Sequence, residues 1–223
     1  MAYVFQFGIV ADHADELIAG AIATLRLSVI AMVLGLAVAA ICAFLRAAGP
    51  WPLRHGVGLY VEVIRNTPFL VQLFVIYFSL PAIGIRFDPD IAAIIGMSIN
   101  FGGYATEILR AGVEAVPRGQ IEAGRALGLT RLRIFMLIIA YPAVKTVYPA
   151  LASQFVILLL GSSVISTISA FELTGVTNSL QSQTFRAFEF YFVGAAIYLA
   201  LALAVKAVLR GIYWFCFERG RAA

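Results

Sequence analysis

Five apolar runs divide this 223-residue sequence, and each is long enough to cross a lipid bilayer. A membrane-spanning helix needs about 20 predominantly apolar residues. The runs cover residues 18–45, 58–80, 90–112, 147–168 and 190–214. The composition agrees, because 62% of the residues are hydrophobic and only 13% are charged, whereas a soluble domain carries about 25% charged residues. The sequence therefore predicts an all-α integral membrane protein with five transmembrane helices in a single domain, residues 18–218.

The basic residues gather on one side of the predicted spans. Of the 16 Lys and Arg residues, all but Arg26, Arg86 and Arg186 lie at or near the loops that follow spans one, three and five. Cytoplasmic loops of membrane proteins carry the excess of Lys and Arg. We therefore expect an extracytoplasmic N-terminal segment, a cytoplasmic loop between spans three and four, and a cytoplasmic C-terminal tail. These parts cover residues 1–17, about 113–145 and 219–223.

The loop between spans three and four carries a polar, glycine-punctuated stretch, RGQIEAGRALGLTRLR. Pro117 and Gly119 are expected to close the preceding segment, and residues 120–127 to form a helix of about two turns. Gly128 suits a left-handed residue just past the helix end, and Thr130 can cap the next helix. Because a helix of two turns is marginal by itself in water, this one is either a connector at the lipid headgroups or a helix that lies in a partner's groove.

Part of this stretch, EAGRALG, resembles the EAA signature of ABC-importer permeases. Glu122, Ala123 and Gly128 match the signature, and Gly124 stands where the family has a second Ala. Three longer blocks are similar to the polar-amino-acid branch of these permeases (His, Glu, Gln, Arg and opine type) and occur in the expected order: YVEVIRNTPFLVQLFVIYFSLP, GGYATEILRAGVEAVPRGQIEAGRALGLT and FEFYFVGAAIYLALAL. The resemblance implies a type I ABC importer-like fold in the inner (cytoplasmic) membrane, with a cytoplasmic coupling helix between spans three and four. The ATPase-coupling residues that it implies are Gln120, Glu122, Ala123, Gly124, Ala126, Leu127 and Gly128.

The same resemblance implies a permease subunit that imports polar amino acids or related compounds by alternating access, driven by ATP. Its expected partners are ABC ATPase subunits, an identical or paralogous second permease, an extracytoplasmic substrate-binding protein and membrane lipid, with no nucleic acid. The sequence contains no G-x-x-x-x-G-K-[ST] phosphate-binding loop, so no cofactor is expected in this chain. ATP and Mg are expected on the partner ATPase, and the chain itself is expected not to be an enzyme.

Two departures from the family pattern predict local changes of backbone. Tyr141 stands where a proline is expected and Pro142 comes one residue late, while Pro149 is back in register. We expect a local adjustment where the chain re-enters the membrane. In the second span, Asn66 replaces a glycine shortly before Pro68. Asn tolerates the left-handed region better than most residues, so the bend is expected to survive.

Uncharged polar side chains at membrane depth are candidates for a substrate pathway. The candidates are Gln72, Asn100, Tyr104, Gln154, Ser162 and Ser163. Taken singly, each is more often an interhelical hydrogen-bonding group than a ligand contact. As a set they could hold the ammonium and carboxylate groups of an amino acid.

The charged residues of the spans allow both a structural and a functional interpretation. Glu107 and Arg110 are three residues apart, as are Glu62 and Arg65, and this spacing predicts ion pairs on helix surfaces. Arg26, near the outer end of the first span, either extends its side chain to the headgroups or anchors a substrate carboxylate.

The main alternative function is a secondary transporter or channel that is not driven by ATP. Such a protein is expected to contain inverted repeats or an intramembrane relay of acidic residues, and neither is evident in the sequence. An intramembrane hydrolase using Ser162 or Ser163 lacks a base, because His13 and His55 fall outside the apolar cores of the runs. A membrane scaffold that only docks a soluble protein stays open, and copurification of an ATPase subunit would separate it from an importer.

Overall fold

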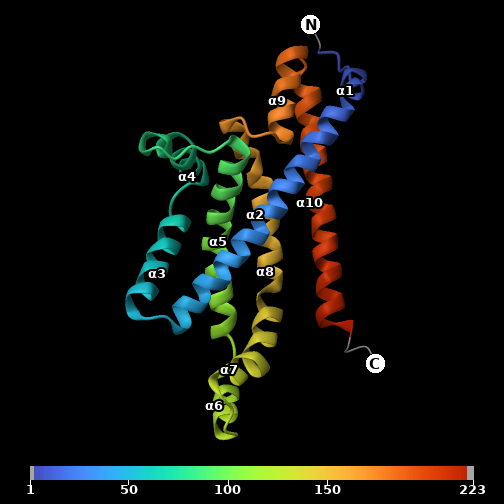
Figure 1. Ribbon diagram of the computed structural model, residues 1–223. Coiled ribbons are helices and arrows are strands. Elements are labelled where there is room, and N and C mark those ends of the chain that lie inside the picture. The colour runs from blue at the N-terminus through green and yellow to red at the C-terminus, as the bar shows by residue number, and fades with distance from the viewer. Residues whose placement is uncertain (1–2, 220–223) are drawn as a thin grey trace.

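The computed structural model describes residues 3–219, and these contain helices but no β-strand. The elements in chain order are α1 (Gly8–Asp12), α2 (Ala14–Ala48), α3 (Trp51–Arg65), α4 (Phe69–Phe74), η1 (Val75–Ser79), η2 (Leu80–Ile83), α5 (Pro89–Glu114), α6 (Arg118–Ala126), α7 (Arg131–Ile134), η3 (Phe135–Ile139), α8 (Ala140–Gly161), η4 (Ser162–Ile168), α9 (Leu173–Thr184) and α10 (Ala187–Phe217). Of the η elements, η1 and η3 are π-helical, whereas η2 and η4 are 3-10 helices. Figure 1 shows α5, α8 and α10 running along the long axis of the molecule and α2 crossing them obliquely. The prediction of an all-α protein is confirmed.

Four stretches are long and apolar enough to cross a membrane unbroken. They are Ala14–Ala47, Pro89–Glu114, Leu132–Ile168 and Ala187–Phe217. They agree with predicted spans one, three, four and five, although the fourth begins well before residue 147. The predicted span of residues 58–80 is instead a pair of helical segments bent by 110°, so the described chain has five spans if this pair counts as one.

The bend lies at Pro68, as expected, but Asn66 does not adopt the left-handed conformation that was predicted for it. Asn66 has φ −105° and ψ 7°, which is not left-handed, and its side-chain amide donates to the Glu62 carbonyl over 2.8 Å. The change of direction comes at Pro68, which is extended at φ −61° and ψ 138°. Because proline has no N–H and restricts the residue before it, α3 ends at Arg65 and α4 starts afresh at Phe69.

Helix α5 lies at the centre of the bundle. Of the 18 residues that define it as a span, 56% are buried, against at most 39% for the three other unbroken spans. Its side chains Met97, Phe101 and Ala105 are at most 1% exposed and pack in one apolar cluster with Leu27 of α2 and Leu158 of α8. The central helix is therefore the element against which polar residues from the others are positioned.

Helix α9 is the element that the span analysis missed. It covers the polar stretch between spans four and five, where no helix was predicted. The carboxylate of Glu172 caps it by accepting the N–H groups of Thr174 (2.8 Å) and Gly175 (2.6 Å). Leu173 and Leu180, seven residues apart on one helical face, are fully buried. At 12 residues the helix is too short to span a bilayer, so a search for long apolar runs cannot find it.

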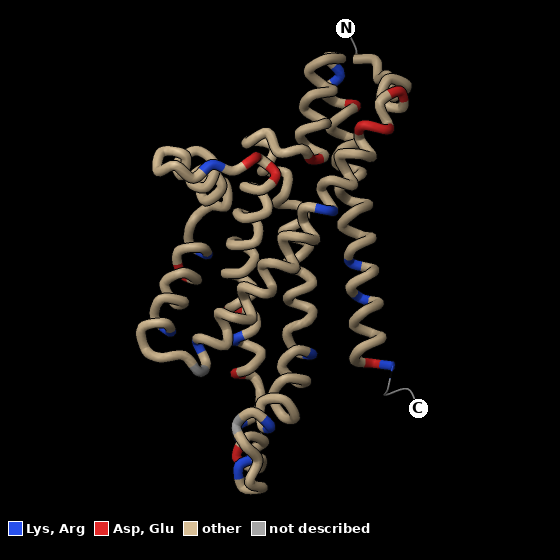
Figure 2. Tube along the Cα trace, viewed as in Figure 1, with Lys and Arg blue, Asp and Glu red and all other residues tan. Residues whose placement is uncertain are grey.

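Charge is distributed unequally between the two ends of the molecule. Figure 2 shows Lys and Arg mainly toward the end that carries α6, and most Asp and Glu toward the opposite end, where the chain begins. Arg26 is one of the basic residues at the N-terminal end, and its guanidinium lies 3.9 Å from Asp90 with the Arg26 side chain 65% exposed. Arg26 is therefore near a carboxylate of its own chain.

One of the two predicted intrahelical ion pairs forms. The Arg110 side chain donates to the Glu107 carboxylate, with Nε 3.1 Å from Oε2, and Arg46 of α2 joins the same carboxylate over 3.2 Å. The Glu62–Arg65 pair is not among the ion pairs of residues 3–219, so that prediction is wrong. The Arg65 guanidinium instead lies 5.8 Å from the ring centroid of Tyr104.

Candidate functional site

Helix α6 projects beyond the ends of α5 and α8 (Figure 1). It begins two residues earlier than predicted, and Pro117 precedes it in an extended conformation with ψ 129°. Gly119 therefore lies in the first turn of α6 and does not close the preceding helix, which ends at Glu114. A helix of nine residues without a bundle around it is marginal by itself and needs support from other contacts.

Support at the C-terminal end of α6 comes from Gly128. Its φ is +72°, and its N–H donates to the Arg125 carbonyl over 2.9 Å. The next N–H, of Leu129, donates to the Gly124 carbonyl over 3.1 Å. This pair of hydrogen bonds is a Schellman ending, which satisfies carbonyls that a helix end leaves free. The prediction of a left-handed Gly128 is confirmed.

Support along the body of α6 comes from Gly124, which is buried against the following helix. A Cβ atom at Gly124 would lie 2.6 Å from Cδ1 of Ile138 and 3.2 Å from Cγ1 of Ile134. The absence of a side chain lets α6 approach α7 and η3 closely. Gly124 therefore faces its own chain, whereas the family resemblance grouped it with the ATPase-coupling residues.

The remaining predicted coupling residues face solvent. Those that are exposed are Gln120, Glu122, Ala123, Ala126, Leu127 and Gly128. Leu127 is 79% exposed, and it extends the small surface made by Ala123 and Ala126. A single exposed leucine is ordinary. Here, however, it continues a helix face that has no partner among the described residues.

The chain leaves this helix through α7 and a π-helical turn. The Thr130 hydroxyl accepts the Arg133 N–H over 3.4 Å, as expected of a cap at the start of α7. The π-helix η3 follows immediately and ends two residues before Tyr141. A π turn holds more residues than an α turn. It is thus the local adjustment that the late Pro142 predicted.

The second part of the site is a cavity of about 430 Å³ between the α3–α4 break, α5 and α8, called the polar cavity here for the four polar side chains in its otherwise apolar lining. Asn100 and Tyr104 come from α5, Gln154 comes from α8, and Thr67 comes from the break. The structure thus brings together three of the six predicted pathway residues. Among residues 3–219, neither the Gln154 amide nor the Tyr104 hydroxyl has a hydrogen-bond partner, so both are free to meet a ligand.

Gln72 joins the broken span to this cavity. Its Nε2 donates to the Ile64 carbonyl and to the Thr67 hydroxyl, each over 2.8 Å, and to the Thr67 carbonyl over 3.1 Å. Its Oε1 accepts the Asn100 amide over 2.9 Å. The break at Pro68 frees carbonyl groups that must be satisfied at membrane depth. The Gln72 side chain donates hydrogen bonds to these carbonyls, and it also fixes the orientation of Asn100 at the cavity wall.

Ser162 and Ser163 do not line the cavity. Ser162 is fully buried, and its hydroxyl donates to the Leu159 carbonyl over 2.6 Å. The Ser163 hydroxyl donates to the Leu160 carbonyl over 2.9 Å. Both serines thus satisfy the end of α8 where it changes to the 3-10 helix η4. Thr67 lines the cavity but was not among the candidates, because its place depends on the 110° bend.

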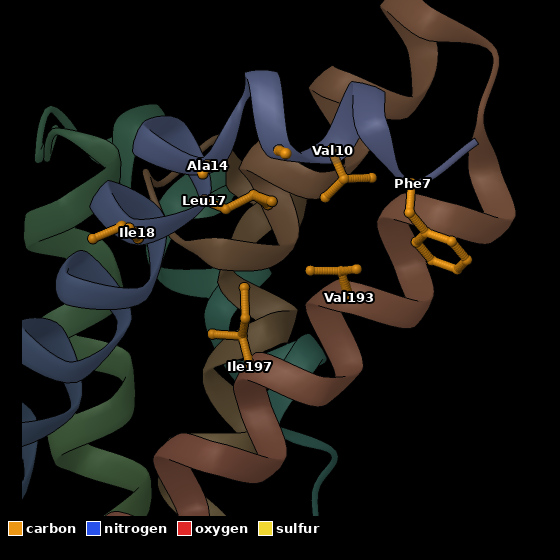
Figure 3. A pocket seen from close by; sticks show the side chains of 8 residues that line it. Phe7, Val10, Ala14, Leu17, Ile18, Val193 and Ile197 are labelled. Carbon is orange, nitrogen blue, oxygen red and sulfur yellow. The ribbon is translucent and has the colours of Figure 1, made fainter. Parts of the chain in front are cut away.

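A different cavity, apolar and of about 250 Å³, lies at the N-terminal end of the molecule. Val10 and Leu17 lie on one side of it, and Val193 and Ile197 of α10 lie on the other (Figure 3). No polar side chain lines it. Among residues 3–219 no group of three or more His, Cys, Asp or Glu side chains is placed to hold a metal ion.

Comparison with known families explains why these parts occur together. The family model described as the binding-protein-dependent transport system inner membrane component matches residues 31–212, which is most of the chain. The chain belongs to this family. Relatives of the chain are permease subunits of ABC transporters and are not enzymes themselves, and the long apolar helices described above agree with a place in the membrane.

Individual relatives cover nearly the whole chain. The glutamine transport system permease protein GlnP of Escherichia coli strain K12 is 36% identical over 196 residues, which are 87% of this chain and 90% of GlnP. The octopine transport system permease protein OccM of Rhizobium meliloti is 32% identical over 214 residues, 92% of this chain and 87% of OccM. A crystal structure of an amino acid ABC transporter with histidines superposes with a TM-score of 0.89 at 34% identity, covering 95% of this chain and 99% of that one.

Proposed function

We propose that this chain is the permease subunit of an ATP-driven importer that carries polar amino acids or related compounds into the cytoplasm. The observation that carries the proposal is α6: this helix and the two residues that follow it expose six of the predicted coupling residues, while Gly124 and Gly128 fix its position and its end. The relatives named above supply the cargo class, because they transport glutamine and octopine.

In this proposal α6 transmits force from a separate ATPase. A helix of nine residues has little stability alone, so docking in an ATPase groove would add the missing contacts. The close contact of Gly124 with Ile134 and Ile138 then links a displacement of α6 to α7, η3 and α8, which are continuous with the wall of the cavity. Closure of the ATPase pair on ATP would in this way drive the change between inward- and outward-facing states.

The polar cavity is the proposed place where cargo passes. Its volume lies within the range of about 300–1,000 Å³ that is common for small-molecule sites. The amide of Gln154 can both donate and accept hydrogen bonds, and the Tyr104 hydroxyl can do the same. Such groups can bind the carboxylate and the ammonium of an amino acid without a fixed charge that would hold it too tightly.

The orientation follows from the charge asymmetry. The end of the molecule that carries α6 is rich in Lys and Arg (Figure 2), and the basic side of a membrane protein faces the cytoplasm. We therefore place α6 and the C-terminal end in the cytoplasm, and the N-terminus and α9 outside. The predicted tail of residues 219–223 lies outside the described residues except for Arg219.

The test is reconstitution in proteoliposomes with and without the cognate ATPase subunits and substrate-binding protein. Uptake of labelled glutamine or octopine is expected only when both partners and ATP are present. Uptake driven by an ion gradient without the ATPase would instead establish the secondary-transporter alternative. A Glu122→Cys variant in a Cys42→Ser, Cys216→Ser background should react with a membrane-impermeant maleimide only from the cytoplasmic side, and reaction from the outside would refute the orientation.

A further inference from the structure

A third cavity, of about 560 Å³, lies between α8 and α10 in the half of the molecule nearer to α6. Lys206 and Arg210 of α10 line it, together with Tyr148 and Ser153 of α8. Lys206 and Arg210 are four residues apart, so they lie on the same face of the helix. The cavity therefore has two positive charges on one wall.

Neither of these two cations has an anionic partner in the part of the chain that the structure describes. Among residues 3–219, no carboxylate lies within 4.0 Å of either side chain, since the ion pairs involve Arg26, Arg46, Arg110 and Arg186 instead. Lys206 lies eleven positions before the last residue of α10, Phe217, which at 1.5 Å per residue is roughly 16 Å along the helix. Unpaired charge at such a depth is costly in lipid, and an anion in the cavity would offset that cost.

Aromatic rings mark the depth of the cavity in the membrane. Tyr148, Tyr213 and Phe217 form a cluster with ring centroids 5.3–5.9 Å apart. Tyrosines gather where lipid headgroups meet acyl chains. The cavity thus opens toward the headgroup level of one leaflet, and the long cationic side chains that line it farther along α10 can extend toward phosphate there.

Two hydrogen bonds hold α8 and α10 together beside the cavity. The Tyr148 hydroxyl donates to the Leu209 carbonyl over 2.9 Å. Lys145 Nζ lies 3.4 Å from the Phe217 carbonyl, to which it donates, and it brings a third positive charge to this end of the two helices. The cavity therefore has walls that are fixed to each other and an excess of positive charge.

We propose that this cavity binds the phosphate headgroup of an anionic phospholipid from the leaflet on the α6 side. Basic pockets between transmembrane helices on the cytoplasmic side are suited to anionic headgroups. A lipid fits better than free phosphate because exposed apolar side chains continue along α10 on both sides of Arg210, including Val208 (62%) and Phe215 (60%). A second protein copy fits less well, because lysine is depleted from the cores of protein interfaces.

The chain contains its own reporter for this site. It has two tryptophans, Trp51 on α3 and Trp214, which lies one turn beyond Arg210 on α10. In a Trp51→Phe variant, the fluorescence of Trp214 alone can be quenched by phospholipids brominated near the headgroup end of their acyl chains. The permease complex is reconstituted in phosphatidylcholine vesicles that contain a minor fraction of either brominated phosphatidylglycerol or brominated phosphatidylcholine.

We expect the anionic brominated lipid to quench Trp214 at lower mole fraction than the zwitterionic one. Because each basic residue contributes about fivefold to the association of an anionic lipid, Lys206→Gln with Arg210→Gln should lower the preference by roughly 30-fold or abolish it. The exchange Lys206→Arg with Arg210→Lys should retain it. A matched control, Arg54→Gln with Arg133→Gln, removes the same charge from the same side of the protein away from the cavity and should leave the preference unchanged.

Four results would overturn the proposal. One is equal quenching by the two lipids in the parent, and another is a preference that survives loss of both cations. The third is protection of Trp214 from both lipids, which would mean that protein covers this face. Addition of inorganic phosphate separates the two sources of phosphate: the lipid preference should persist, and its loss would assign the cavity to a soluble anion.

Discussion

Substitution of Gly128 by alanine isolates the contribution of one backbone conformation to coupling. Gly128 has φ +72°, and no atom lies within 4 Å of the place where its Cβ would be. The methyl group therefore meets no neighbour, and the whole cost is the strain of an L-residue in the left-handed region, about 1–2 kcal/mol. Because 1.4 kcal/mol corresponds to a factor of ten, the equilibrium constant for forming the end of α6 from its unwound state should fall roughly 5- to 30-fold.

The assay is ATP hydrolysis by the reconstituted complex, stimulated by the loaded substrate-binding protein, together with the uptake that accompanies it. Gly128→Ala is expected to lower both, or the affinity of the permease for its ATPase, by about the factor given above. Gly128→Asn should perform better than Gly128→Ala, because asparagine enters the left-handed region more readily than alanine. This ordering distinguishes backbone conformation from side-chain bulk.

Gly119→Ala is the matched control for this series. Gly119 also has open space around it, but it lies in the first turn of α6 without a positive φ. Alanine there favours the helix by about 1 kcal/mol, so coupling should be equal to that of the parent or better. The reasoning is refuted if Gly128→Ala couples as well as Gly119→Ala, or if Gly128→Asn is no better than Gly128→Ala.

Three further predictions concern the polar cavity and the end of the protein that carries α9. Gln72→Leu removes the donor that satisfies carbonyls at the α3–α4 break, and it should lower the free energy of unfolding by about 1–3 kcal/mol. Thermal unfolding in detergent measures this change, with Leu70→Ala as a control at an exposed position. Gln154→Ala should raise the substrate concentration needed for half-maximal uptake while leaving thermal stability unchanged, and an unchanged concentration dependence would remove Gln154 from the pathway. Burial raises the pKa of the Glu172 carboxyl above its ordinary value, so the folded state holds this proton more tightly than the unfolded state does. The contribution of Glu172 to the free energy of unfolding is therefore greatest below about pH 4.3 and is lost as the pH rises through the raised pKa. The variant Glu172→Gln, which keeps an oxygen to cap α9, should flatten this part of the profile of stability against pH. An unaltered slope in the variant would show that Glu172 is not the group responsible.

Some of this protein could be predicted because the information is local in the chain. The length of the apolar runs predicted five spans, four of which are unbroken helices, since a bilayer has a fixed thickness and backbone groups must be satisfied within the helix that crosses it. Pro68 predicted a break because proline cannot donate to a helix ladder. Gly128 predicted a left-handed helix end for an equally local reason, and the late Pro142 predicted the irregular turn that precedes it.

Other features depended on contacts between distant segments. The Glu62–Arg65 pair has the spacing of an ion pair, yet the Arg65 guanidinium lies over the Tyr104 ring from another helix. Ser162 and Ser163 look like pathway residues, but their hydroxyls turn back to carbonyls of α8. In each case several partners were within reach, and spacing along the sequence does not rank them.

The sequence by itself determined which segments cross the membrane, where the chain must turn, and which short stretch carries the family's signature. Only the tertiary structure decided that α9 packs as a helix at the N-terminal end of the molecule, that Gln72 connects the bend to Asn100, and that Gly124 faces inward. The physical reason is the range of the interactions. Helix length, proline and left-handed glycine act within a few residues, whereas a buried face or a shared hydrogen bond exists only once helices far apart in the chain have met.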